Sequence, residues 1–234
     1  MVKKAICLIS GGLDSCVASW IAKDKGFQIY ALTFSYEQLH TKELQCAQDI
    51  AKQLPIQEHV VIPIPFQKFC KSSLLQNSEM PLEANTLDTI GSVIPSTYVP
   101  ARNTIFLSIA LGYAESIDAH SIFIGANAVD YSGYPDCRPH YFSAFQKMAD
   151  LATKRGIQGR SIEIETPLLH MSKAMIIQTG VKLQAPLAKT WSCYQGNTYA
   201  CGRCDSCLLR LKGFQDAGVH DPLTYQEYPV WYTQ

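Results

Sequence analysis

Two groups of residues in this chain have the types and the spacing that chemistry requires. The first is the turn Ser10-Gly-Gly-Leu-Asp-Ser15, close to the N-terminus. Its adjacent glycines permit backbone angles that other residues avoid, and its two serines can donate hydroxyl hydrogen bonds. A helix that begins within such a turn presents unpaired N–H groups and a partial positive charge. The turn therefore predicts a binding site for phosphate or pyrophosphate.

The second group is a cluster of four cysteines near the C-terminus. Their spacing is Cys193-x7-Cys201-x2-Cys204-x2-Cys207, and two-residue gaps let successive thiolates turn onto one ion. Four sulfurs complete the tetrahedral shell of a structural zinc ion, with no position left open. An iron–sulfur cluster is the alternative, because ferredoxins also contain Cys-x2-Cys-x2-Cys. Their pattern continues to a Cys-Pro pair, which is missing after Cys207, so we expect one zinc ion per chain.

The elements that must position these groups alternate along the chain. Short apolar runs predict strands, and apolar residues at helical spacing predict helices. The expected strands are 5–9, 28–34, 58–62, 121–125 and 161–165. The expected helices are 13–25, 41–54, 103–116, 140–154 and 172–179. This alternation predicts an α/β fold, with helices on both faces of a doubly wound, mostly parallel five-stranded sheet.

The composition changes after Pro186, where cysteines, aromatic residues and turn residues replace the alternation. We therefore expect an α/β nucleotide-binding domain over residues 1–185 and a small zinc-binding segment over residues 186–234, packed on it. The stretch 66–101 has no clear period and contains three of the prolines. Such an insertion is typical of a lid or ligand loop, and equally of a plain surface loop.

Charge and hydropathy exclude several classes of protein. The 234 residues carry 20 basic and 20 acidic side chains, so the formal net charge is zero. A balanced chain is a poor candidate for binding a nucleic acid backbone. The apolar run 103–114 is shorter than the roughly 20 residues of a membrane-spanning helix, and the apolar stretch at the N-terminus is too short for a signal peptide. We expect a cytoplasmic protein with neither a nucleic acid nor a membrane as its partner.

The two groups belong to a wider set of motifs. The first turn matches the Ser-Gly-Gly-x-Asp-Ser signature of the PP-loop ATP-pyrophosphatase superfamily, which has an adenine nucleotide α-hydrolase-like fold. The cysteines stand in Thr190-Trp-Ser-Cys-Tyr194 and in Cys201-Gly-Arg-Cys-Asp-Ser-Cys207-Leu-Leu-Arg210. With Val99-Pro-Ala-Arg-Asn-Thr104, these motifs resemble the 7-cyano-7-deazaguanine synthase family over nearly the whole chain. One departure is Tyr36-Glu37-Gln38, where the family has Tyr-Gly-Gln.

The resemblance implies a specific reaction. Such enzymes convert 7-carboxy-7-deazaguanine and ammonia to the nitrile 7-cyano-7-deazaguanine with ATP, in the biosynthesis of the queuosine precursor. The reaction passes through an adenylated acid, an amide and an adenylated amide. The chain would then be an ATP-dependent carbon–nitrogen ligase that uses ATP with Mg²⁺. The resemblance also implies a homodimer.

The resemblance further implies roles for particular residues. Asp14 would organise the magnesium–phosphate cluster, and Lys173 would offset charge on the ATP phosphates, so the expected catalytic residues are Ser10, Asp14, Ser15 and Lys173. The expected nucleotide-binding residues are Ile9, Ser10, Gly11, Gly12, Leu13, Asp14, Ser15, Cys16, Val17, Ala18 and Ser19.

The expected substrate-binding residues are Arg102, Asn103, Asp136 and Arg138. An arginine at a helix start can hold a carboxylate bidentately, and Asp136 could accept hydrogen bonds from the N–H edge of a deazaguanine. The plainer alternatives are a helix cap at Arg102 and Asn103, and an internal ion pair between Asp136 and Arg138.

Two other functions compete with the synthase. A PP-loop enzyme that transfers sulfur to a tRNA base would need a catalytic cysteine pair or a redox cluster, and a basic RNA-binding surface. The zero net charge argues against it. A zinc-ribbon interaction module on a degenerate nucleotide fold is the non-enzymatic alternative, and the intact turn Ser10–Ser15 argues against degeneration.

Overall fold

The computed structural model describes residues 2–36, 42–75, 87, 90, 94–129, 133–196 and 198–232. A five-stranded sheet of order β3-β2-β1-β4-β5 forms its centre, and all of its ladders are parallel. The strands are β1 (Lys4–Leu8), β2 (Gln28–Ser35), β3 (Ile56–Pro63), β4 (Ser121–Phe123) and β5 (Glu163–Glu165). The predicted α/β fold with a doubly wound five-stranded sheet is confirmed, and the strand order reverses beside β1.

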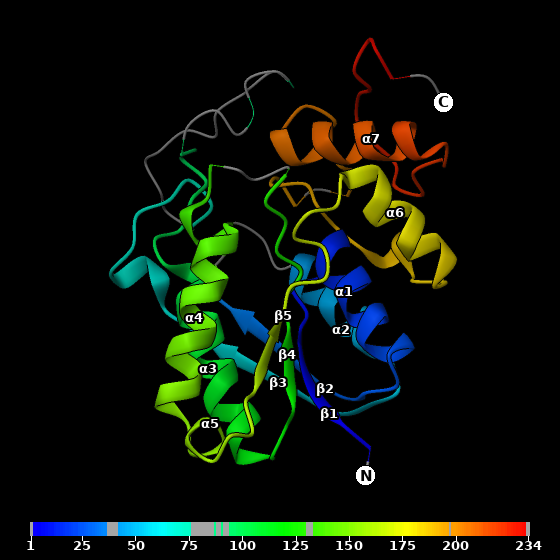
Figure 1. Ribbon diagram of the computed structural model, residues 1–234. Coiled ribbons are helices and arrows are strands. Elements are labelled where there is room, and N and C mark those ends of the chain that lie inside the picture. Colours follow the sequence, from blue (N-terminus) through cyan, green and yellow to red (C-terminus); the bar gives the residue numbers. More distant parts are fainter. Residues whose placement is uncertain are drawn as a thin grey trace.

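Helices cover both faces of the sheet. They are α1 (Leu13–Asp24), α2 (Lys42–Ala51), α3 (Arg102–Ser116), α4 (Pro139–Ala152), α5 (Lys154–Ile157), α6 (Lys173–Lys182) and α7 (Asp205–Ala217). Figure 1 shows α3 and α4 on one side of the sheet, α1 and α2 on the other, and α7 beyond the carboxyl ends of the strands. Among the described residues, no helix combines the length and the apolar composition that crossing a lipid bilayer requires.

Each face of the sheet has its own core because successive side chains of a strand point to opposite faces. Ile6 and Leu8 of β1 pack with the apolar faces of α3 and α4. Ala5 and Cys7 of the same strand pack with α1 and α2, where Trp20 is the largest member. The three central strands β2, β1 and β4 are largely buried on both faces, as is typical of parallel sheets, and this holds their carboxyl ends in fixed positions.

One helix, α7, was not expected. Its buried residues Cys207, Leu211 and Phe214 are spaced four and three apart, and Gly218 ends it at a φ of +67°. Phe214 packs in a core shared with Ile177 of α6. The C-terminal segment therefore shares apolar contacts with the α/β part, while a domain boundary at residue 185 remains a prediction.

The expected helix over 140–154 is interrupted. α4 ends at Ala152, and Thr153 adopts extended angles that break the helix. The hydroxyl of Thr153 accepts a hydrogen bond from the amide of Gly156 at 3.0 Å and so caps α5. A threonine side chain competing for a backbone N–H explains the interruption.

Candidate active site

The turn Ser10–Ser15 links β1 to α1 at the carboxyl edge of the sheet. Its hydroxyls bond each other: Ser10 Oγ donates to Ser15 Oγ at 3.0 Å, and Ser15 Oγ donates to the carbonyl oxygen of Gly12 at 3.0 Å. Gly11 has a φ of +90°, and a Cβ there would overlap the carbonyl oxygen of Glu43 in α2. Only glycine fits this position, because both its backbone angle and its contact exclude a side chain.

The start of α1 completes a site suited to an anion. Among the described residues, no side chain caps this helix at Gly12, so the amide N–H groups of its first turn are available to a ligand. On the far side, a Cβ on Gly125 would lie 2.7 Å from the backbone of Asp14 and Ser15. The end of β4 therefore presses against this turn and fixes its position. The geometry suits a phosphate, and phosphate binding itself remains a prediction.

Asp14 and Lys173 form an ion pair above the turn. Lys173 Nζ lies 2.8 Å from both carboxylate oxygens of Asp14, and their side chains are 9% and 16% exposed. Ser172 positions the lysine, because its hydroxyl accepts the amide N–H of Met175 and caps α6. The structure thus brings together two residues that lie 159 positions apart in the sequence.

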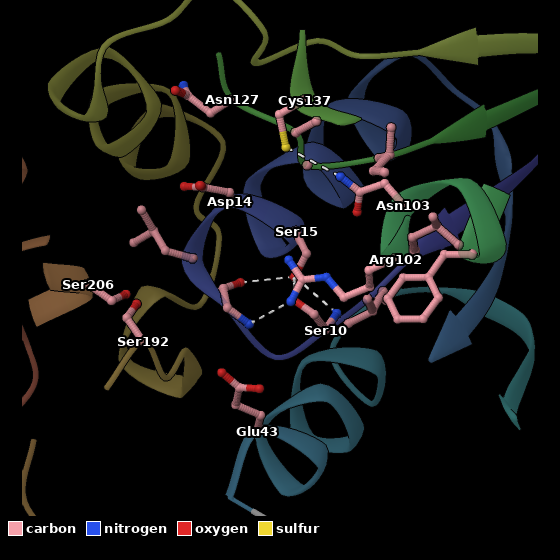
Figure 2. A pocket seen from close by; sticks show the side chains of 18 of the residues that line it. Ser10, Asp14, Ser15, Glu43, Arg102, Asn103, Asn127, Cys137, Ser192 and Ser206 are labelled. Carbon is pink, nitrogen blue, oxygen red and sulfur yellow. Dashed lines mark hydrogen bonds between the residues drawn. The ribbon is translucent and has the colours of Figure 1, made fainter. Parts of the chain in front are cut away.

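A cavity of about 250 Å³ opens from this turn (Figure 2). Its apolar wall includes Leu8, Leu32, Phe34, Leu74, Phe106, Ile124 and Ala126. Its polar wall includes Ser10, Asp14, Ser15, Glu43, Arg102, Asn103, Asn127, Lys173, Ser192, Ser206 and Arg210. An apolar hollow with a few convergent polar groups is typical of a small-molecule site.

The expected nucleotide-binding run divides between cavity and core. Its cavity-lining residues are Ile9, Ser10, Gly12, Leu13, Asp14 and Ser15. Cys16, Val17, Ala18 and Ser19 are buried on the core side of α1 instead. Glu37 and Gln38, where the sequence departs from the family pattern, lie outside the described residues.

Of the expected substrate-binding residues, two reach the cavity and two do not. Arg102 and Asn103 line it, and Nη1 of Arg102 lies 3.4 Å from the hydroxyl of Tyr36. Arg138 is exposed at the start of α4, outside the lining. Asp136 is buried and turned toward α3, where its Oδ2 accepts the amide N–H of Asn103 at 2.9 Å. The carboxylate of Asp136 therefore satisfies a helix terminus. The alternative considered for it, an ion pair with Arg138, is not among the salt bridges of the described residues.

Replacing Asp136 tests this cap. The variant Asp136→Ala leaves a buried amide N–H without an acceptor, so we expect the free energy of unfolding to fall by about 1 to 2 kcal/mol. Asp136→Asn keeps an oxygen acceptor and should lose less. Urea unfolding of both variants measures the difference. Equal stability of Asp136→Ala and the wild type would show that the cap contributes nothing.

Glu43 was not singled out in the sequence, yet its side chain points from α2 into the cavity (Figure 2). Burial raises the pKa of Glu43 to about 7, with the Cys193 sulfur adding to the rise and the Arg102 guanidinium opposing it. A carboxyl group that titrates near neutrality can exchange protons at physiological pH. No sequence signal identified it, because its place depends on how α2 packs against the turn at Gly11.

The C-terminal segment also lines the cavity, through Arg210 of α7. This arginine is 2% exposed, and its Nε and Nη2 bond the two carboxylate oxygens of Asp221 at 2.8 and 2.9 Å. Its Nη1 bonds the hydroxyls of Thr190 and Ser192 at 2.7 and 3.3 Å. Ser192 lines the cavity, so the buried Arg210 network holds this part of the chain against the site.

The four expected metal ligands come together. One Sγ from each of Cys193, Cys201, Cys204 and Cys207 lies within 4.8 Å of the others, and all four residues are buried. The sulfurs of Cys201 and Cys207 are 3.8 Å apart, close to the tetrahedral edge of about 3.8 Å that follows from a zinc–sulfur bond of about 2.3 Å. Thiolates so close together suit one ion, because a multi-iron cluster spreads its ligands over several metal atoms.

Backbone amides surround these sulfurs. The amides of Gln195 and Cys201 donate to Cys193 Sγ at 3.4 and 3.3 Å, and the amide of Cys204 donates to Cys201 Sγ at 3.3 Å. Such hydrogen bonds orient thiolates and stabilise their charge. Trp191, two residues before the first ligand, donates its amide to the carbonyl of Gly11 at 2.9 Å, so the metal centre and the turn are joined by a short stretch of chain.

Fold and site together define a class: an α/β protein with a small-molecule cavity at the first strand–helix turn of a parallel sheet. A family model described as "Queuosine biosynthesis protein QueC" matches residues 4–218. The chain therefore belongs to the QueC family of queuosine biosynthesis proteins.

Curated relatives agree with this assignment. A 7-cyano-7-deazaguanine synthase from Thermoplasma volcanium is 50% identical over 100% of this chain and 95% of its own length. Proteins of the same name from Citrifermentans bemidjiense and Coxiella burnetii are 52% and 54% identical, over 97% and 96% of this chain and 100% and 98% of their own. The expected family is confirmed, and the synthase is favoured over the tRNA base-modifying alternative.

Proposed function

We propose that this chain converts 7-carboxy-7-deazaguanine and ammonia to 7-cyano-7-deazaguanine at the expense of ATP. The observation that carries the proposal is that the turn Ser10–Ser15, the apolar wall and the Arg102 guanidinium all line the same cavity. A heterocyclic acid needs an apolar surface for its ring and a cation for its carboxylate. A nucleotide needs an anion site beside them. The full-length match to named synthases supports the same reaction.

The chemistry that these residues must support has two activations. A carboxylate resists nucleophiles, so its oxygen first attacks the α-phosphorus of ATP and pyrophosphate leaves. Ammonia then displaces AMP to give the amide. A second ATP activates the amide oxygen, and loss of AMP and protons forms the carbon–nitrogen triple bond. We assign to Lys173 and to the N–H groups of the turn the stabilisation of charge that develops on the phosphates.

The scheme uses no covalent bond to the enzyme. Among the described residues that line the cavity, Cys137 is the one cysteine, and its Sγ accepts a hydrogen bond from Asn103 Nδ2. Burial, and to a smaller extent the charge of Asp136, raises the pKa of Cys137 to about 11. A thiol with this pKa stays protonated at neutral pH and is a weak nucleophile.

Two metal ions complete the proposal. Mg²⁺ would accompany ATP, and Asp14 is the carboxylate of the turn able to face it, with Lys173 holding that side chain in place. Zinc would be bound by Cys193, Cys201, Cys204 and Cys207, one ion per chain. With four protein ligands such an ion is structural and supplies folding energy rather than a reactive position.

We also propose a cytoplasmic homodimer. None of the nine cysteines forms a disulfide, which suits a reducing compartment. Residues 186–234 would form the zinc-binding unit packed on the unit 1–185. Within that segment Tyr228 and Val230 are exposed, while Tyr225 is buried and donates its hydroxyl to Asp221 at 2.6 Å. The exposed members are the candidates for contact with a second copy.

The amide intermediate tests the proposed reaction. If one cavity performs both activations, the carboxamide of 7-deazaguanine should itself be a substrate, and should give the nitrile with ATP and no added ammonium. Mass spectrometry of the product measures this. Formation of nitrile from the acid by an enzyme that leaves the added amide untouched would contradict the single-site scheme.

A further inference from the structure

The cavity wall contains five charged side chains among the described residues, and three of them are already neutralised. Asp14 is bound by Lys173 through both carboxylate oxygens. Arg210 is bound by Asp221, also through both oxygens. The remaining two are Glu43 and Arg102. The structure gives neither of them a salt bridge within the described part of the chain.

Glu43 and Arg102 enter the cavity from different elements. Glu43 stands in the first turn of α2, next to the phosphate-binding turn, and its side chain has no hydrogen bond among the described residues. Arg102 is the first residue of α3 and points into the same space, with a neutral tyrosine hydroxyl as its hydrogen-bonding neighbour. The Arg102 guanidinium lowers the pKa of Glu43, yet the two side chains form no salt bridge within the described part of the chain. The cavity thus offers one anionic and one cationic group to ligands.

The reaction proposed above brings two small charged species to this cavity, besides ATP. One is the carboxylate of the acid, which suits Arg102. The other is ammonia, which exists in neutral water mainly as the ammonium ion and is a nucleophile only after it loses a proton. We propose that Glu43 is the catalytic residue that binds the ammonium ion and accepts its proton. This inference rests on the proposed function.

The step balances without a further reactant. Ammonium donates one proton to the carboxylate of Glu43, and the lone pair of the resulting ammonia forms a bond to the acyl carbon of the adenylated acid. The carbon–oxygen bond to AMP breaks, and AMP leaves with that electron pair. The new nitrogen loses its second excess proton to water, which leaves the neutral amide, and Glu43 returns its proton to water before the next turnover.

The surroundings of Glu43 favour this role. The charged groups facing it are the Arg102 guanidinium from α3 and the Cys193 sulfur from the C-terminal segment. Because burial raises the pKa of Glu43 to about 7, the carboxylate is a stronger base than an exposed glutamate and still gives up its proton near neutral pH. Among the residues that the structure describes, none donates a hydrogen bond to its two oxygens, so these can accept N–H groups of an ammonium ion.

The variant Glu43→Gln tests the proposal in the full-length enzyme. Glutamine keeps the size and a hydrogen-bond acceptor but removes the charge and the base. We expect the KM for ammonium to rise by about tenfold or more and the amide-forming kcat to fall, while the KM for ATP stays within about twofold. Asp49→Asn, on the exposed side of the same helix, is the matched control and should leave the KM for ammonium unchanged.

Hydroxylamine separates a role in ammonium binding from a structural one. It is uncharged at neutral pH and attacks acyl adenylates directly, so Glu43→Gln should still form the hydroxamate from acid and ATP. Glu43→Asp should recover part of the ammonium-dependent rate. An unchanged KM for ammonium, or equal losses with ammonium and hydroxylamine, would overturn the assignment of Glu43. If the wild type itself made neither amide nor hydroxamate, the proposed function would fail instead.

Discussion

Replacing Asp14 by asparagine should lower the rate of adenylation by about 10²- to 10³-fold, the size of effect that follows when a preorganised charge is removed from a water-excluded site. The loss has two causes. The variant removes the carboxylate that would face Mg²⁺, and it leaves Lys173, only 9% exposed, without its counter-charge. The lysine is then free to take a position that no longer suits the phosphates.

Asparagine is chosen because it keeps the shape of Asp14 and one oxygen acceptor for Lys173 Nζ. The fold and the metal content should therefore stay intact, as circular dichroism and metal analysis would show. Asp24→Asn, at the exposed end of the same helix, is the matched control and should keep full activity. Pyrophosphate release with acid and ATP is the measurement. Wild-type rates in Asp14→Asn would contradict the role assigned to the turn.

The second large effect concerns the metal centre. The purified chain should contain about one zinc ion, and Cys204→Ser should lose it, because three thiolates leave the shell incomplete. Metal binding to a structural site of this kind is worth about 10 to 16 kcal/mol and is coupled to folding. We therefore expect a lower unfolding temperature and fast amide exchange over α7, which carries the last ligand, Cys207.

Activity should fall as well, because Arg210 of α7 and Ser192 belong to the cavity wall. Cys46 supplies the control: it packs against the same apolar cluster but is not among the four clustered sulfurs. Cys46→Ser should retain the metal and most of the activity. A protein that held iron and sulfide, or a Cys204→Ser variant that kept its full zinc content, would show that the four-thiolate zinc assignment is wrong.

The features that could be predicted from the sequence are those that depend on the types and spacing of neighbouring residues. The apolar runs at 5–9 and 28–34 predict buried strands. The glycines of the first turn predict backbone angles that other residues avoid. The spacing of the four cysteines likewise predicts a metal site with four thiolate ligands. These signals lie within a few residues of each other, so no knowledge of tertiary packing is needed to interpret them.

What could not be predicted depends on contacts between distant elements. Glu43 resembles any solvent-facing glutamate in a helix, and only the packing of α2 against Gly11 turns it into the cavity. From the sequence, Asp136 is a candidate for recognising a base. In the structure its carboxylate instead accepts the amide N–H of Asn103 at the start of α3. The sequence does not reveal the helix α7 because its buried residues include the polar Asp205, Ser206 and Arg210. The partners of Arg210, Asp221 and Thr190, lie outside the helix.

The central claim is that one enzyme uses two activations to turn a carboxylic acid into a nitrile. The most direct measurement incubates the purified chain with 7-carboxy-7-deazaguanine, ammonium and Mg²⁺-ATP, and counts AMP released per nitrile formed. The chemistry predicts two AMP for each nitrile starting from the acid, and one starting from the amide. Accumulation of amide with a single AMP and no nitrile, or nitrile formed with ADP instead of AMP, would contradict it.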